Sequence, residues 1–133
     1  MIYVNVLEHV ENDREELEIC YKTLSSKGSL LTFVPALPCL YSAFDQKLGH
    51  FRRYKKDKLN EIVTNAGFKI VTSRYFDMPG ALAWYLNFKL LNLSISPEKV
   101  LLYDRFIVPV IKRLEALIPP PVGKNILLIA KKS

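Results

Sequence analysis

Cysteine is scarce in this chain, and its two occurrences follow no pattern. The 133 residues contain only Cys20 and Cys39, in unrelated contexts and without a CxxC spacing. This argues against both a zinc-binding cysteine framework and a disulfide-stabilised scaffold. Met1 is followed by Ile-Tyr-Val-Asn and then by acids, not by the basic and apolar stretches of a signal peptide. We therefore expect a reducing, cytoplasmic environment.

Glycine clusters and long apolar runs are also missing. The five glycines are isolated, so the chain has no GxG turn that would bring backbone amides close to a ligand. The longest uncharged stretch of its leucine-rich region, Met78 to Phe88, is too short to span a bilayer. Internal repeats, low-complexity tracts and linkers are absent. These features indicate a single domain over residues 1–133.

Charge is plentiful and unevenly distributed. The net charge is +6, yet residues 1–18 carry six acids against Arg14, whereas Arg52 to Lys58 (RRYKKDK) holds five bases and one acid. Such a basic stretch can meet phosphate, anionic lipid or an acidic substrate, or it can be the solvated start of a helix. It lacks interleaved aromatic residues on a recognisable platform, so we do not predict specific nucleic-acid binding.

Half of the residues are apolar, which is enough to bury a core, and four short apolar runs predict strands. These runs are residues 2–7 (IYVNVL), 29–34 (SLLTFV), 68–75 (FKIVTSRY) and 125–130 (NILLIA). A helix is predicted from about Asp13 to Ser26, capped by Asn12 with Glu15 completing a capping box. A second helix is predicted over residues 56–66, ending at Gly67. Strand, helix and strand in succession predict a parallel βαβ crossover.

The segment from Met78 to Val122 interrupts this pattern. Its leucines and aromatic residues predict two or three amphipathic helices. Trp84, Tyr85 and Phe88 fit the core of a lid helix. They also fit a hydrophobic cap over an acyl or polyprenyl substrate, or a surface that docks on a membrane.

Polar side chains follow the first two predicted strands. Asn5, Glu8 and His9 close the first, and a loop of about nineteen residues follows the second, well above the usual connection length. Ligands bind beyond the carboxyl ends of the strands in open parallel sheets. We therefore expect both groups to meet at one sheet edge.

Several motifs give this chain a family resemblance. VNVLEHVENDREEL, LSSKGSLLTFVPA and LYSAFDQKLGHFRRYKKDKLNEIVTNAGFKI resemble the carboxyl-terminal half of class I S-adenosylmethionine-dependent methyltransferases. They are most similar to a bacterial subgroup with VLEH and LYS..D...GH.RRY motifs. The resemblance implies an α/β fold, with a partial Rossmann-like sheet of strands equivalent to 4-5-7-6 and the last strand antiparallel. Residues 1–77 would form the βαβαβ part, 78–122 a helical insertion or lid, and 123–133 the terminal strand.

The same resemblance implies methyl transfer from S-adenosylmethionine to an O or N nucleophile of a small-molecule or lipid-linked acceptor. The family's glycine-rich turn and ribose-binding acid precede the matched region, so we expect this chain alone to bind the cofactor weakly or not at all. The alternative is a truncated, non-catalytic module that serves association or regulation. An unpaired strand at Ile2 to Leu7 predicts self-association, or complementation by an amino-terminal fragment. Peripheral contact with a membrane is compatible with either function.

Site residues follow from the matched positions. Asn5, Leu7 and Glu8 are predicted to contact the cofactor, although core packing explains Leu7 equally well. His9 and His50 are predicted catalytic bases. For His9, a structural hydrogen bond to the following loop is an equal alternative.

The long loop supplies a predicted substrate-side wall of Tyr41, Asp45, Arg53 and Tyr54. The competing interpretation is an internal salt bridge between Asp45 and an arginine.

Some methyltransferases carry an ExxEH pattern that binds a divalent metal at the position of Asn5-Val-Leu-Glu8-His9. Asn5 replaces the first carboxylate here. His50 could add a ligand, and one carboxylate with two imidazoles is acceptable chemistry for a metal. The lost charge weakens the match, and no metal site is predicted.

Overall fold

The computed structural model describes residues 1–86, 97–118 and 120–132. The strands are β1 (Ile2–Val4), β2 (Ser29–Pro35), β3 (Phe68–Phe76) and β4 (Asn125–Lys132). The main helices are α1 (Asp13–Thr23), α2 (Ala43–Lys47), α3 (Lys56–Asn65), α4 (Met78–Trp84), α5 (Pro97–Leu102) and α6 (Val108–Leu117). Shorter turns are the 3₁₀ helices η1 (Leu7–His9) and η2 (Pro38–Leu40) and the π-helical turn η4 (Tyr103–Ile107).

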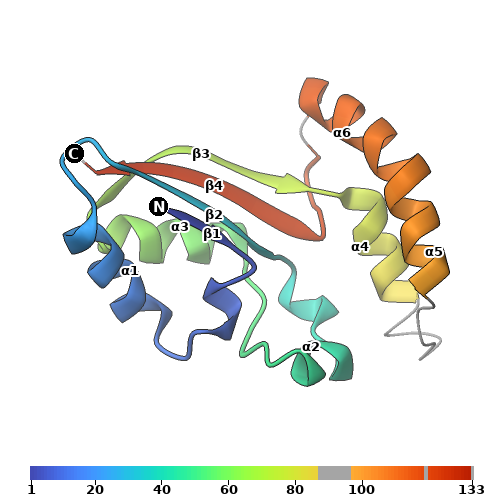
Figure 1. Cartoon of the computed structure of the whole chain (residues 1–133), viewed down its shortest axis with the longest axis horizontal. Helices are drawn as coiled ribbons and strands as arrows, with labels where there is room; N and C mark the ends of the chain where they lie inside the picture. The colour runs from blue at the N-terminus through green and yellow to red at the C-terminus, as the bar shows by residue number, and fades with distance from the viewer. Residues whose placement is uncertain (87–96, 119, 133) are drawn as a thin grey trace.

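The four strands form one mixed sheet in the order β1-β2-β4-β3 (Figure 1). β1 runs parallel to β2, and β4 runs antiparallel to both β2 and β3. This arrangement confirms the predicted order and the antiparallel last strand. β1 lies at the edge of the sheet and is paired along one side to β2 alone. The carboxyl ends of β1 and β2 therefore lie together, as the crossover predicts.

The first strand is shorter than the sequence indicates. β1 ends at Val4, because Asn5 adopts a left-handed conformation with φ 51°, which asparagine tolerates better than most residues. The amide of Asn5 still donates to the carbonyl of Phe33, 2.9 Å away, and the chain then turns into η1. The prediction of a strand through Leu7 is therefore wrong in its second half. Leu7 lies in η1, where its side chain is fully buried.

Asn12 caps α1 as predicted. Its Oδ1 accepts from the amide of Glu15 at 3.4 Å, and its Nδ2 donates to Glu15 Oε2 at 2.9 Å. The reciprocal bond thus joins two side chains instead of returning to the backbone of the cap. α1 ends at Thr23, short of the predicted Ser26. α3 matches its prediction closely and is followed by Gly67, whose φ of 103° requires glycine.

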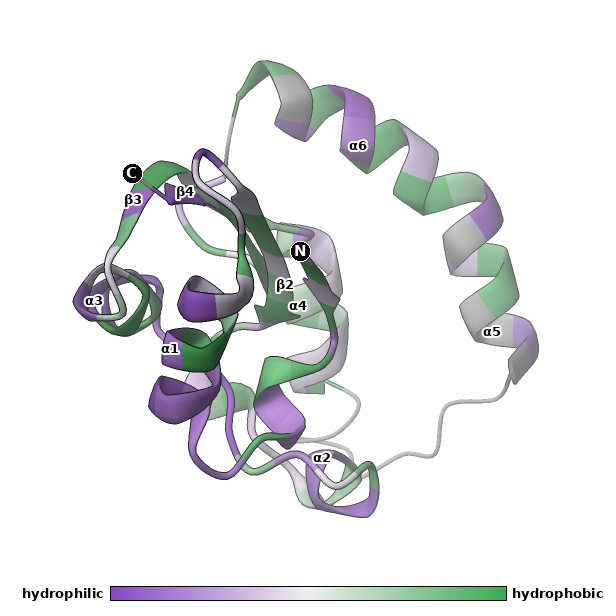
Figure 2. Ribbon diagram, turned by 60° about the vertical axis from the view of Figure 1, so that its left-hand side comes forward, coloured by the Kyte–Doolittle hydropathy of each residue, from purple (hydrophilic) through white to green (hydrophobic). Residues whose placement is uncertain are grey.

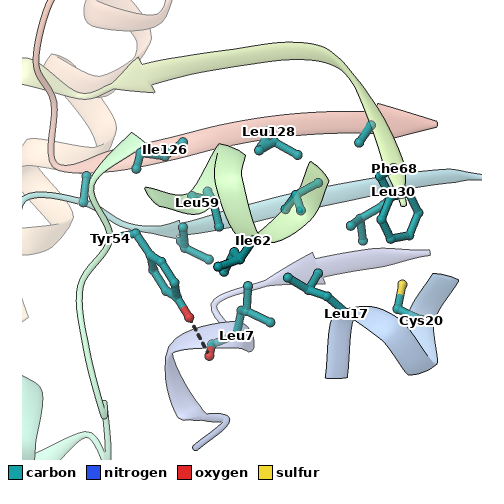
Figure 3. Packing of buried hydrophobic residues seen from close by; sticks show 14 residues of the cluster. Leu7, Leu17, Cys20, Leu30, Tyr54, Leu59, Ile62, Phe68, Ile126 and Leu128 are labelled. Carbon is teal, nitrogen blue, oxygen red and sulfur yellow. Dashed lines mark hydrogen bonds between the residues drawn. The ribbon is translucent and has the colours of Figure 1, made fainter. Parts of the chain in front are cut away.

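The core lies between one face of the sheet and the helices α1 and α3 (Figure 3). Alternate residues of the two central strands point into it, namely Leu30, Thr32 and Val34 of β2 and Ile126, Leu128 and Ala130 of β4. Leu17 and Cys20 of α1 and Leu59, Ile62 and Val63 of α3 fill the other side. Each fully buried leucine contributes about 1.5–3 kcal/mol relative to an exposed one. This core holds in place the carboxyl ends of β1 and β2, where the polar residues that follow these strands lie.

The helices α4, α5 and α6 occupy the segment for which amphipathic helices are predicted. α5, η4 and α6 follow one another without a break from Pro97 to Leu117. Figure 2 shows them as a rod that lies apart from the sheet. Glu115 ties this rod to α4 by accepting hydrogen bonds from the amides of Asp77, at 2.8 Å, and Met78, at 3.0 Å. Within the described residues, no helix combines the length and apolarity needed to cross a bilayer.

Candidate functional site

A cavity of about 390 Å³ lies at the carboxyl ends of β1 and β2. Its walls come from η1, from the loop between β2 and α3, from α4 and from the start of β4. The lining residues are Asn5, His9, Phe33, Pro35, Phe44, Leu48, His50, Arg53, Trp84, Lys124 and Asn125. The two predicted polar groups, one after each strand, thus meet at a single opening.

Backbone and side-chain bonds hold the long loop against η1. The amide of Phe51 donates to the carbonyl of Glu8 at 2.8 Å. Arg52 donates to the carbonyl of Glu11 at 2.7 Å and forms an ion pair with Asp13 at 2.8 Å. These bonds bring His50, distant in sequence, next to His9. The two imidazole rings meet edge to face, with their centroids 4.7 Å apart.

Both histidines use Nδ1 to bind an acceptor. His9 Nδ1 lies 3.2 Å from the carbonyl oxygen of Gly49, and His50 Nδ1 lies 3.0 Å from Asp45 Oδ1. A carbonyl and an ionised carboxylate can only accept, so Nδ1 carries the proton in each neutral ring. The lone pair of each ring is therefore on Nε2. His9 is therefore held through Gly49 of the long loop before α3, and not by the loop that directly follows it, as the sequence indicated. The bond orients the ring without occupying its basic nitrogen.

Asp45 organises the loop around His50. It is fully buried and accepts hydrogen bonds from the amide and hydroxyl of Ser42, at 2.9 and 3.0 Å, as part of the capping box of α2. Its Oδ1 also accepts from Arg53 Nε at 2.9 Å and pairs with Nη2 at 2.8 Å. Burial by itself raises the pKa of Asp45, but the bonds from Arg53 and His50 outweigh it and lower the pKa overall. The internal salt bridge considered from the sequence is therefore present.

Glu8 has no comparable support. Its side chain is fully buried, and neither carboxyl oxygen has a hydrogen-bond partner among the described residues. Burial raises the pKa of this carboxyl, while the backbone amide of Glu8 itself and then the nearby His50, His9 and Arg53 act in the opposite direction. Glu8, His9 and His50 each offer one ligand atom within 4.8 Å of the others. They are a group that could hold a metal ion.

The remaining predicted residues fall into two sets. Asn5 lines the cavity, and the Tyr41 hydroxyl donates to the carbonyl of His50 at 2.7 Å, which supports the loop from behind. Leu7 and Tyr54 lie in the core instead. The Tyr54 hydroxyl lies 3.1 Å from the carbonyl of Leu7 and 2.9 Å from Asp13 Oδ2. Because only 4% of Tyr54 is exposed, its ring belongs to the core and not to a wall facing the substrate.

Sequence reasoning missed Lys124 and gave Trp84 mainly a packing role. Lys124 Nζ lies 5.1 Å from the centre of the Trp84 ring, and the guanidinium carbon of Arg53 lies 4.5 Å from it. Trp84 Nε1 also donates to the carbonyl of Leu40 at 3.2 Å. One signal was available. The last strand was expected to be antiparallel, so its first residues must lie at the carboxyl ends of its neighbours.

The two aromatic residues predicted together with Trp84 do not line the cavity among the described residues. Tyr85 is exposed, and Phe88 lies outside the described residues.

Comparison with solved structures identifies the fold. A SAM-dependent methyltransferase from Archaeoglobus fulgidus aligns with a TM-score of 0.54 and 19% identity, covering 98% of this chain and 57% of its own. Phosphoethanolamine N-methyltransferase 2 of Haemonchus contortus, in complex with S-adenosyl-L-methionine, aligns with a TM-score of 0.53 and 13% identity, covering 98% and 32%. The [4+2]-cyclase SpnF aligns with a TM-score of 0.51 and 14% identity, covering 98% and 49%.

The chain thus has the fold of class I methyltransferases over nearly its whole length, which confirms the resemblance at the level of fold. It spans about half the length of the first of these structures. No family model matches the chain, and no curated protein matches it in sequence.

Proposed function

We propose that this chain forms the substrate side of an S-adenosylmethionine-dependent methyltransferase that acts on an O or N nucleophile. The observation that carries the proposal is the pair His9 and His50. Both rings lie at the carboxyl end of the parallel strands, each has its Nε2 lone pair unused by the Nδ1 bond, and both border one cavity. In open α/β sheets this is the edge where ligands bind.

The chemistry requires little beyond alignment. The acceptor oxygen or nitrogen forms a bond to the methyl carbon while the carbon–sulfur bond breaks, and sulfur keeps the electron pair. The proton released by the acceptor passes to Nε2 of His9 or His50. Positioning supplies most of the acceleration in such a transfer. A correctly placed base adds about 10²–10⁴-fold.

The cofactor needs more protein than the cavity offers. Asn5 lines the cavity and Glu8 lies beside His9 and His50, but the chain has no clustered glycines. The unpaired edge of β1, with Ile2 and Val4 70% and 51% exposed, is suited to receive a further strand. We propose that a strand–turn–helix unit with a glycine-rich turn pairs with this edge, in the same polypeptide or a separate one, and supplies the cofactor grip. Self-association through the edge is the competing arrangement.

A lipid-linked acceptor suits the helical rod. Exposed apolar residues recur along α5, η4 and α6 at a spacing of mostly four, giving one apolar stripe: Leu102, Phe106, Val110, Leu114 and Leu117. Exposed stripes of this kind mark contact with an apolar partner. The basic side chains of Arg105, Lys112 and Arg113 lie on the same segment. They complement an anionic headgroup or phosphate.

The second candidate is a non-catalytic module that serves association or regulation. The fold also occurs in a [4+2]-cyclase, so the fold alone does not imply methyl transfer, and the site has to decide the function. In that case the cavity would bind a ligand or partner without a methyl donor.

Calorimetry separates the two candidates. S-adenosylmethionine titrated into this chain alone should show no tight binding. The same titration into an assembly that adds a GxGxG-containing unit at β1 should show micromolar binding. In the complete assembly, His9→Ala should slow turnover about 10²-fold, whereas Glu11→Gln on the adjoining loop should not. A micromolar dissociation constant for the lone chain would remove the need for a second part, and an assembly that binds no cofactor supports the non-catalytic module.

A further inference from the structure

Glu8, His9 and His50 form a cluster that could do more than accept a proton. From their burial, orientation and spacing we infer that these three side chains bind one divalent cation of the zinc type. The inference rests on side-chain geometry and is independent of the proposed methyl transfer.

The first argument is the state of Glu8. A carboxyl group that is fully buried and lacks any hydrogen-bond partner among the described residues is costly to leave alone. Arg53 is engaged by Asp45 and by the carbonyl of Ala36, 3.3 Å away. A bound cation would compensate this buried carboxylate directly.

The second argument is the orientation of the two imidazoles. Metal-binding histidines in proteins characteristically donate their second N–H to a carboxylate or a backbone carbonyl, which fixes the tautomer and aims the other nitrogen at the metal. His50 has the carboxylate version, through Asp45, and His9 has the carbonyl version, through Gly49. Asp45 is itself held by Arg53 and Ser42. The supporting shell is therefore complete for both rings.

The third argument is distance and donor type. One ligand atom from each residue, which for a histidine is Nδ1 or Nε2, lies within 4.8 Å of the others, and bonds of roughly 2.0–2.2 Å bring the ligands of one ion to within about 4 Å. Because His9 is exposed on η1, we expect its ring to move by the remaining distance when an ion binds. Two imidazoles and one carboxylate match the preference of Zn²⁺ and similar ions, whereas Mg²⁺ and Ca²⁺ favour all-oxygen sites. A site with three protein ligands is also open to a substrate oxygen from the cavity.

In an enzyme, such an ion would change the roles of the two imidazoles. It would hold the acceptor oxygen and ease the loss of its proton to solvent water, while the imidazoles would serve as ligands instead of bases. The bond changes at the methyl carbon would stay the same, because the acceptor would still attack in line as the carbon–sulfur bond breaks.

The test uses the untagged 133-residue chain, treated with chelator and titrated with Co²⁺ as a spectroscopic substitute for Zn²⁺. We expect one Co²⁺ per chain with visible absorption of a nitrogen–oxygen site, loss of that absorption when Zn²⁺ is added, and no displacement by millimolar Mg²⁺. His9→Ala, His50→Ala and Glu8→Gln should each weaken Co²⁺ binding at least about tenfold. Glu11→Gln, an exposed acid near Glu8, is the matched control and should leave the affinity unchanged.

His9→Ala keeps the test decisive, because an exposed side chain on η1 can be shortened without opening the core. Added Zn²⁺ should also raise the unfolding temperature of the wild-type chain and of Glu11→Gln, but not of His9→Ala. The inference is overturned if the wild-type chain binds no Co²⁺, if His9→Ala and Glu8→Gln bind it as tightly as wild type, or if Mg²⁺ displaces it.

Discussion

His50 Nδ1 lies 3.0 Å from Oδ1 of Asp45, and the same oxygen is paired with Arg53 Nη2 at 2.8 Å. One buried carboxylate therefore neutralises a buried guanidinium and orients the imidazole that faces the cavity. Stability and site geometry depend on the same side chain. This relationship means that the salt bridge and the functional role of the loop, which are alternatives at the level of sequence, coexist in the fold.

The Asp45–Arg53 pair gives a stability prediction. Asp45→Asn should lower the free energy of unfolding by about 3 kcal/mol, because it leaves the buried Arg53 charge without its partner. The measurement is urea unfolding followed by circular dichroism. Glu61→Gln breaks the exposed pair between Lys58 and Glu61, 2.6 Å apart, and should leave the urea midpoint unchanged. Equal losses of unfolding free energy in the two variants would show that the buried pair stabilises the fold no more than the exposed one.

Tyr54 gives a prediction about pH. Burial, followed by the neighbouring charge and hydrogen bond of Asp13, raises the pKa of its hydroxyl above the usual value. Tyr54→Phe should cost about 1–2 kcal/mol near pH 8 through loss of a buried hydrogen bond. The unfolded tyrosine ionises near pH 10, whereas the folded one stays protonated, so the tyrosine contribution is complete below pH 10 and falls as pH rises.

At pH 11 the wild-type advantage over Tyr54→Phe should accordingly be smaller by about 1.4 kcal/mol. Urea unfolding of both proteins at the two pH values measures this difference. Tyr85→Phe, at an exposed position, should match wild type at both. A wild-type advantage that grows with pH would contradict the predicted sign.

The apolar stripe of α5, η4 and α6 predicts binding to lipid surfaces. The chain should float with vesicles of phosphatidylcholine and phosphatidylglycerol, because exposed leucines can enter the interface beside basic side chains. Leu114→Asp combined with Leu117→Asp, at positions 61% and 81% exposed, should abolish flotation. Ile19→Asp, at a half-exposed position on α1, should not. A wild-type chain that stays at the bottom of the gradient removes the membrane version of the proposal.

Local patterns determined much of this protein from the sequence alone. The Asn12 cap, the glycine that ends α3 and the last three strands depend on neighbouring residues and on hydrophobic periodicity. The antiparallel last strand and the sheet order came from the resemblance to methyltransferases. The end of β1 was misjudged, because periodicity does not register that Asn5 enters the left-handed region.

The site divides along the same line. The sequence predicted the residue types of the site and the sheet edge where they gather, because strand ends and long loops can be located along the chain. Only the tertiary structure decided which of them meet. The bond from Phe51 to Glu8 and the ion pair of Asp45 with Arg53 bring His50 beside His9, while Tyr54 turns into the core. Such long-range pairings depend on the packing of distant segments, which leaves no periodic signal in the sequence.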